Sequence, residues 1–175
     1  MNKKLVILYI IFVSYSIISM FFNRQVTLDF LALFQLQGDA LLVMTFNMLG
    51  VFPLYYLLVA STYERQKWYV YVLFGFSFMF GAFATIPGLL LLKGNQKPLS
   101  KTQERFFILL PLTLLIMSIV GILFGNISDY SQLFLNDQFV HIMTIDFFIL
   151  LLMPYLMGAT GFPYVHLITW RAGIY

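Results

Sequence analysis

Five apolar runs, each long enough to cross a membrane, constrain this chain more than any other feature. They are residues 5–22, 40–60, 68–92, 106–125 and 139–157. A hydrocarbon core of about 30 Å needs roughly 17–25 apolar residues in helical form. Unpaired backbone amides are costly in lipid, and no alternating strand pattern is present, so each run is predicted to be a helix. We therefore expect an all-α integral membrane bundle of about five transmembrane helices, with residues 1–175 forming one domain.

The composition excludes most soluble alternatives. Hydrophobic residues make up 61% of the chain and charged residues 10%, whereas soluble globular proteins have about 45–50% and about 25%. So few charges cannot cover the surface of a soluble enzyme, a nucleic-acid-binding module or a disordered regulator. The chain has no cysteine, which excludes disulfides and thiol catalysis. We expect a multi-pass protein of the cell membrane, in contact with membrane lipid and with no nucleic-acid partner.

The N-terminal run has two interpretations. Lys3 and Lys4, an apolar stretch over 5–13 and the small residues Ser14 and Ser16 have the order of a signal peptide. The apolar sequence continues to residue 22, which favours an uncleaved first helix. A shorter apolar septet, residues 30–36, is predicted to be an interfacial or re-entrant segment, and residues 126–138 are predicted to be a loop.

The basic residues do not fit five crossings well. An N-terminus inside the cell leaves four of ten Lys and Arg residues on the cytoplasmic side, and the reverse orientation leaves six. If residues 68–92 entered and left from one side, nine of ten would be cytoplasmic. That run contains residues that favour a broken path: Gly75, Gly81, Pro87 and Gly88. Twenty-five apolar residues are nevertheless typical of one tilted helix, so we predict five crossings with the loop 93–105 in the cytoplasm.

Asp146 is the one acidic residue within the apolar runs. An isolated charged carboxylate at the centre of a membrane helix costs at least ~2.5–3.5 kcal/mol, so Asp146 is expected to have a partner. Two interpretations stay open. Asp146 forms part of a site for a proton, a cation or a polar ligand, or it forms a hydrogen bond that holds helices together.

Asn47 is the second residue expected to be polar and buried, and its surroundings are similar to those of Asp146. Residues 44–47 and 143–146 share the pattern Met-Thr-apolar-Asn/Asp, and a proline and a tyrosine follow each of them. Internal repeats build midplane sites in many transporters, although two such short matches also arise by coincidence. Asn47 and Asp146 are therefore the candidate intramembrane polar site.

The remaining residues give no catalytic motif. His141 lies five positions before Asp146, which places the two side chains about 140° apart on a helix, so we predict an interfacial histidine and no acid–base pair. No nucleotide loop, metal motif or nucleophile motif is present. We predict no catalytic residue, no metal ligand and no cofactor.

Small residues recur at the spacing that brings helices together. Gly121 and Gly125 form a GxxxG motif, and Ser77 and Gly81 have the same spacing. Such stripes let helix backbones approach closely. We expect them to pack the bundle of one chain rather than to form a dimer.

One segment resembles a known family. Residues 46–55, Phe-Asn-Met-Leu-Gly-Val-Phe-Pro-Leu-Tyr, are similar to the F-N-x-x-G-x-x-P-x-x-Y segment of a family of small polytopic membrane proteins from photosynthetic organisms and plastids. Residues 81–87 resemble its next helix, and Asp146-Phe147-Phe148 with Pro154 resembles the end of its last helix. The family has no established activity. The resemblance implies a shared fold and singles out Asn47 and Asp146 without naming a reaction.

Two functional hypotheses follow. The first is a non-enzymatic accessory or scaffold protein that packs against another membrane protein or lipid, because the loops are too small for a catalytic apparatus. The second is a carrier or a lipid-modifying enzyme that handles a small molecule, lipid or ion in a pocket formed by Asn47 and Asp146. The two differ in whether Asn47 and Asp146 converge on one cavity or face separate helix contacts.

Overall fold

The computed structural model describes residues 3–22, 26, 33–157, 164 and 167. Within these residues the chain is helical and contains no strand, so the prediction of an all-α bundle is confirmed. The helices are α1 (Lys3–Ser19), α3 (Ala40–Ser61), α4 (Trp68–Phe80), α5 (Ala82–Leu90), α6 (Lys101–Phe124), α7 (Ile127–Asn136) and α8 (Gln138–Leu156).

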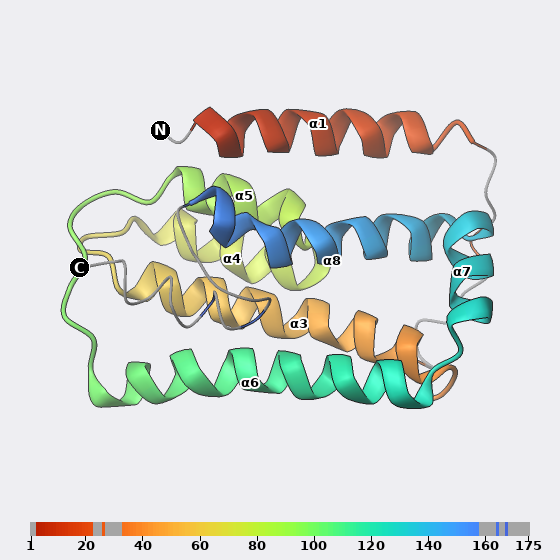
Figure 1. Ribbon diagram of the computed structural model, residues 1–175. Helices are drawn as coiled ribbons and strands as arrows, with labels where there is room; N and C mark the ends of the chain where they lie inside the picture. The colour runs from red at the N-terminus through yellow and green to blue at the C-terminus, as the bar shows by residue number, and fades with distance from the viewer. Residues whose placement is uncertain (1–2, 23–25, 27–32, 158–163, 165–166, 168–175) are drawn as a thin grey trace.

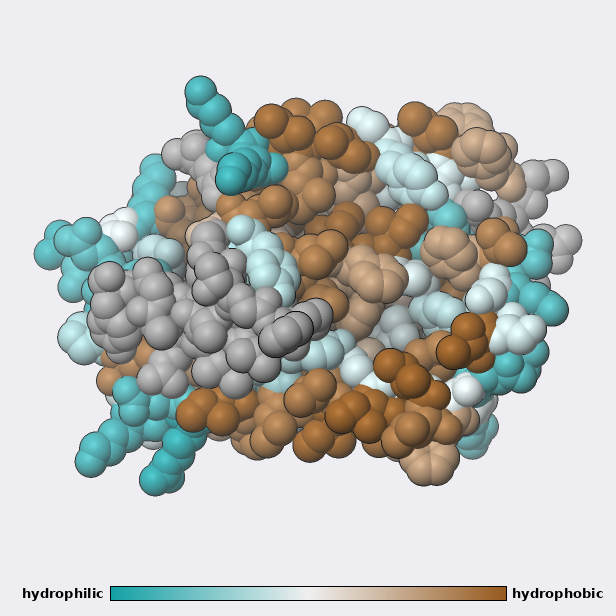
Figure 2. All heavy atoms as spheres, viewed as in Figure 1, coloured by the Kyte–Doolittle hydropathy of each residue, from teal (hydrophilic) through white to brown (hydrophobic). Residues whose placement is uncertain are grey.

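The long helices lie side by side along one direction (Figure 1). Three of the described helices, α3, α6 and α8, are long and apolar enough to cross a membrane. Apolar residues gather along the middle of the visible face, and hydrophilic residues gather at its two ends (Figure 2). Many large apolar side chains point outward, such as Ile116 and Ile122 of α6. Apolar helices with such exposed sides indicate a membrane protein.

The run 68–92 is not one helix, so that prediction is wrong. Gly81 has φ 48° and ψ −126°, and it separates α4 from α5. Glycine adopts such a positive φ with little strain because it has no Cβ. The chain reverses at this point, and α4 and α5 form a helical hairpin whose two outer ends lie at the same end of the bundle (Figure 1).

Hydrogen bonds between the flanking loops hold the base of this α4–α5 hairpin. The amide of Glu64 donates to the carbonyl of Asn95 at 3.0 Å, and the amide of Lys97 donates to the carbonyl of Thr62 at 2.7 Å. The chain therefore enters and leaves the hairpin from one side. The hairpin extends over only part of the length of α3 and α8 (Figure 1).

The predicted loop 126–138 contains a helix, α7, which corrects that expectation. The Asn126 side chain caps it by accepting hydrogen bonds from the amides of Ser128 and Asp129. Tyr130, Leu133 and Phe134 have helical spacing and pack against a buried cluster formed by α3 and α8. α7 lies across the end of the bundle (Figure 1).

The other helix boundaries differ from the prediction by a few residues. The second and fifth runs match α3 and α8 within one residue at each end. α6 begins at Lys101, five residues early, because Ser100 and Gln103 form a capping box. Part of the predicted interfacial segment, residues 30–32, lies outside the described residues.

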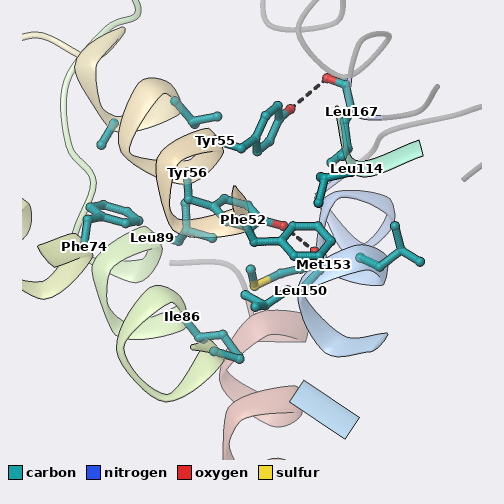
Figure 3. Close-up of a cluster of buried hydrophobic side chains, with 14 of the residues drawn as sticks. Phe52, Tyr55, Tyr56, Phe74, Ile86, Leu89, Leu114, Leu150, Met153 and Leu167 are labelled. Atoms are coloured by element: carbon teal, nitrogen blue, oxygen red, sulfur yellow. Dashed lines mark hydrogen bonds between the residues drawn. The ribbon is translucent and has the colours of Figure 1, made fainter. Parts of the chain in front are cut away.

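The core lies in the half of the bundle that the α4–α5 hairpin fills. Phe52, Tyr55 and Tyr56 of α3 meet side chains of the hairpin and of α8, such as Ile86 and Leu150 (Figure 3). The Tyr56 hydroxyl donates to the carbonyl of Leu150 at 2.6 Å. This half is therefore packed with large side chains, and the other half contains the cavity described next.

Candidate functional site

A cavity of about 500 Å³ lies at the tip of the α4–α5 hairpin, between α3 and α8. Its walls are mainly apolar and include Phe46 of α3, Phe83 of the hairpin and Met143 of α8. Its polar side chains are those of Asn47, Ser77 and Asp146. Because the hairpin ends part of the way along α3 and α8, it leaves this space between their remaining halves. We call it the intramembrane cavity.

Asp146 lines the cavity from α8 and has a partner from the hairpin. The residue is 6% exposed, and its Oδ1 accepts a hydrogen bond from the backbone amide of Ala82 at 2.7 Å. Ala82 is the first residue of α5, and the N-terminus of a helix has unpaired amides and a partial positive charge. The broken helix therefore gives the carboxylate a partner within the bundle that is neither Lys nor Arg.

Gly81 is required at the hairpin tip for two reasons. Its φ is positive, and a Cβ at this position would lie 1.7 Å from Oδ2 of Asp146. The spacing of Ser77 and Gly81 predicts a small-residue stripe for helix packing, but the structure places Gly81 against the Asp146 carboxylate. Ser77 is buried, and its hydroxyl donates to the carbonyl of Phe74 at 2.5 Å.

Asn47 lines the same cavity from α3. Its Nδ2 donates to the carbonyl of Val43 at 2.8 Å and to that of Leu33 at 3.4 Å. Asn47 lies seven residues after the start of α3, and Asp146 lies eight residues after the start of α8. The two helices start at the same end of the bundle (Figure 1), so both residues lie about 11–12 Å from that end at 1.5 Å per residue. Asn47 and Asp146 therefore converge on one cavity at one depth.

His141 does not line the cavity. Its Nδ1 lies 2.9 Å from the carbonyl oxygen of Phe134, and its Nε2 lies 2.5 Å from the hydroxyl of Tyr15. A carbonyl oxygen only accepts hydrogen bonds, so Nδ1 carries the proton, and in the neutral imidazole Nε2 then accepts from Tyr15. The side chain is buried and joins α8 to α1 and α7. No sequence pattern marks Tyr15 as its partner, because Tyr15 is one of many aromatic residues in the chain.

The GxxxG motif packs α6 against α3 of the same chain. A Cβ at Gly121 would lie 3.2 Å from Cβ of Met44, and a Cβ at Gly125 would lie 2.5 Å from the backbone nitrogen of Leu41. Larger residues at either position would push these two helices apart. These glycines do not line the cavity, and the motif has a packing role.

The described residues contain no group of three or more His, Cys, Asp or Glu side chains placed to hold a metal ion. Comparisons with protein-family models, with curated proteins and with solved structures give no match. The resemblance to the family from photosynthetic organisms therefore stays a prediction.

Proposed function

We propose that this is a multi-pass membrane protein that binds a lipophilic small molecule in the intramembrane cavity. The observation that carries the proposal is the convergence of Asn47 and Asp146 on one cavity of about 500 Å³. Binding sites for small molecules commonly have about 300–1,000 Å³, with apolar walls and a few polar groups that orient the ligand. Of the two hypotheses drawn from the sequence, this convergence favours ligand handling.

The proposed placement in the membrane has four crossings, α1, α3, α6 and α8, with the α4–α5 hairpin re-entrant. The basic residues support it. The described Lys and Arg residues lie at the end of the bundle where the hairpin has its base: Lys3, Lys4, Arg65, Lys67, Lys93, Lys97, Lys101 and Arg105. At the opposite end, the described residues include Asp39, Asp129 and Asp137 and no Lys or Arg. Basic residues favour the cytoplasmic side, so we place the hairpin base in the cytoplasm.

The surroundings of the cavity suggest how a ligand enters. Met79 at the hairpin tip is 81% exposed, and its neighbours Phe78 and Phe80 are also exposed. All three line the cavity. In a bilayer these side chains would meet acyl chains rather than water. We propose that the ligand enters sideways from the lipid, in the half of the membrane away from the cytoplasm.

The accessory or scaffold hypothesis has no comparable support. Its strongest feature is the exposed apolar side of α6, with residues such as Leu109, Ile116 and Leu123. Acyl chains cover such a side on any membrane helix, so it does not require another membrane protein as a partner. The described side chains that line the cavity include one acid and no His, Cys or Lys. The proposal is therefore binding or carriage of the molecule, without catalysis.

Filling the cavity tests this proposal. Gly50 lines the cavity, and a Cβ built on it meets no atom within 4 Å, so Gly50→Leu would occupy cavity volume without a clash at Cβ. Gly75 of α4 has the same open surroundings but does not line the cavity, so Gly75→Leu is the matched control. We would measure saturable binding of labelled dodecanol to the protein in lipid nanodiscs, after subtracting partition into protein-free nanodiscs.

We expect saturable binding to the wild type and to Gly75→Leu, with at least about tenfold weaker binding to Gly50→Leu. Such a loss corresponds to about 1.4 kcal/mol. Equal binding to Gly50→Leu and the wild type would place the probe elsewhere, and absence of saturable binding to the wild type would overturn the proposal.

A further inference from the structure

With Asp146 ionised, the polar side chains of the intramembrane cavity present hydrogen-bond acceptors. Oδ1 of Asp146 is paired with the Ala82 amide. Oδ2 has no hydrogen-bond partner among the described residues. Every fully buried side-chain nitrogen and oxygen in the described part of the chain has a partner, so Oδ2 is not fully buried. Asp146 lines the cavity, and the cavity is the space that Oδ2 reaches.

The other two polar side chains have used their donors. Nδ2 of Asn47 donates to the carbonyls of Val43 and Leu33, which leaves the amide oxygen, an acceptor. The Ser77 hydroxyl donates its one hydrogen to the carbonyl of Phe74, which leaves its oxygen lone pairs. No Lys, Arg, His, Tyr or Trp is among the described residues that line the cavity.

This arrangement selects the polar group of the ligand. A ligand with acceptors alone would leave Oδ2 of Asp146 unpaired within apolar walls, and an unpaired acceptor in such surroundings is unfavourable. A donor would pair with it, and hydrogen bonds to a carboxylate are stronger than those between neutral groups. We infer that the ligand is a lipophilic molecule whose head is a hydrogen-bond donor, a hydroxyl or an amine, and that Asp146 is its main acceptor. This inference rests on the proposed function.

The substitution Asp146→Asn reverses the polarity of this contact with little change in shape. The carbonyl oxygen of asparagine can still accept the hydrogen bond from the Ala82 amide. Its NH2 group then replaces Oδ2, so a donor faces the cavity where an acceptor was. The matched control is Asp137→Asn. Asp137 is a buried aspartate at the start of the same helix that also accepts hydrogen bonds from backbone amides, and it does not line the cavity.

Two probes with the same chain separate donor recognition from apolar binding. Dodecanol has a hydroxyl donor, whereas dodecyl methyl ether has an oxygen that only accepts. We would measure saturable binding of both to the protein in lipid nanodiscs. For the wild type and for Asp137→Asn we expect dodecanol to bind about tenfold more tightly than the ether, as one hydrogen bond to a charged group allows. For Asp146→Asn we expect this preference to disappear, because the NH2 group donates equally well to the oxygen of the ether and to that of dodecanol.

The outcomes distinguish this inference from the proposal on which it rests. Equal affinity of the two probes for the wild type would overturn donor recognition while leaving a cavity that binds lipophiles. A dodecanol preference that survives in Asp146→Asn would overturn the role of Asp146. If neither probe binds the wild type saturably, the proposed function itself fails. The comparison of the two probes on the wild type needs no variant, so the inference stays testable even if Asp146→Asn does not fold.

Discussion

Asp146 connects α8 to the α4–α5 hairpin through one hydrogen bond from the Ala82 amide. The sequence predicts that this carboxylate lies within the membrane and needs a partner, because its position in an apolar run is visible in the sequence. The partner itself could not be predicted. Within a continuous helix the Ala82 amide would donate to a carbonyl four residues earlier, and it is available only because Gly81 breaks the helix. The two interpretations of Asp146 therefore concern different oxygens. Oδ1 forms the hydrogen bond that links the helices, and Oδ2 is the oxygen that would contact a ligand.

The linking role predicts different stabilities for two substitutions of Asp146. Asp146→Leu removes the acceptor and leaves the buried Ala82 amide unpaired, which costs about 1–3 kcal/mol. Asp146→Asn retains an oxygen for this bond. We expect Asp146→Leu to lower the melting temperature in mild detergent and Asp146→Asn to stay near the wild type. A melting temperature for Asp146→Leu equal to that of the wild type would show that the bond to Ala82 does not stabilise the bundle.

Among the elements, hydropathy predicts the uninterrupted helices well and fails where the chain turns inside an apolar run. α3 and α8 match their predicted runs closely because polar or turn residues flank both ends. Residues 68–92 are apolar on both sides of Gly81, so no polar residue marks the reversal. The only sign of the reversal in the sequence is the glycine and proline content of this run. α7 was missed because Asp129 and its polar neighbours resemble a loop, although Tyr130, Leu133 and Phe134 have helical spacing.

The break between α4 and α5 predicts a large effect of Gly81→Ala. The positive φ costs a residue with a Cβ about 1–3 kcal/mol, and the Cβ would also displace the Asp146 carboxylate, which lies 1.7 Å from that position. We expect a marked fall in melting temperature, larger than that of Asp146→Leu.

Gly75→Ala is the control for this substitution. Gly75 lies in the interior of α4 with open surroundings, where alanine stabilises a helix by roughly 0.5–1 kcal/mol. We expect its melting temperature to equal or exceed that of the wild type. Similar melting temperatures for Gly81→Ala and Gly75→Ala would mean that position 81 does not need glycine.

For the whole molecule, the α4–α5 hairpin relates the charge distribution to the position of the cavity. Five full crossings divide the basic residues between both sides of the membrane, whereas the hairpin brings its two flanking basic loops to one end. The same reversal ends the hairpin part of the way along α3 and α8. The half of the bundle that contains the hairpin has an aromatic core, and the other half contains the cavity with Asn47 and Asp146. The reversal at Gly81 thus brings the two basic loops to one end of the bundle and leaves the cavity, the proposed binding site, at the hairpin tip.

Single cysteines in this cysteine-free chain test that arrangement. Glu64 and Gln96 flank the hairpin, and Ser128 lies at the opposite end in α7. In intact cells we expect an impermeant thiol reagent to label Ser128→Cys and to leave both Glu64→Cys and Gln96→Cys unlabelled, with the reverse pattern in inverted vesicles. Labelling of Glu64→Cys and Gln96→Cys from opposite sides would show that residues 68–92 cross the membrane. If both were labelled in sealed, intact cells, the hairpin would stand and the basic end would face outward. The cavity would then open in the cytoplasmic half of the bilayer, and its ligand would have to come from that leaflet.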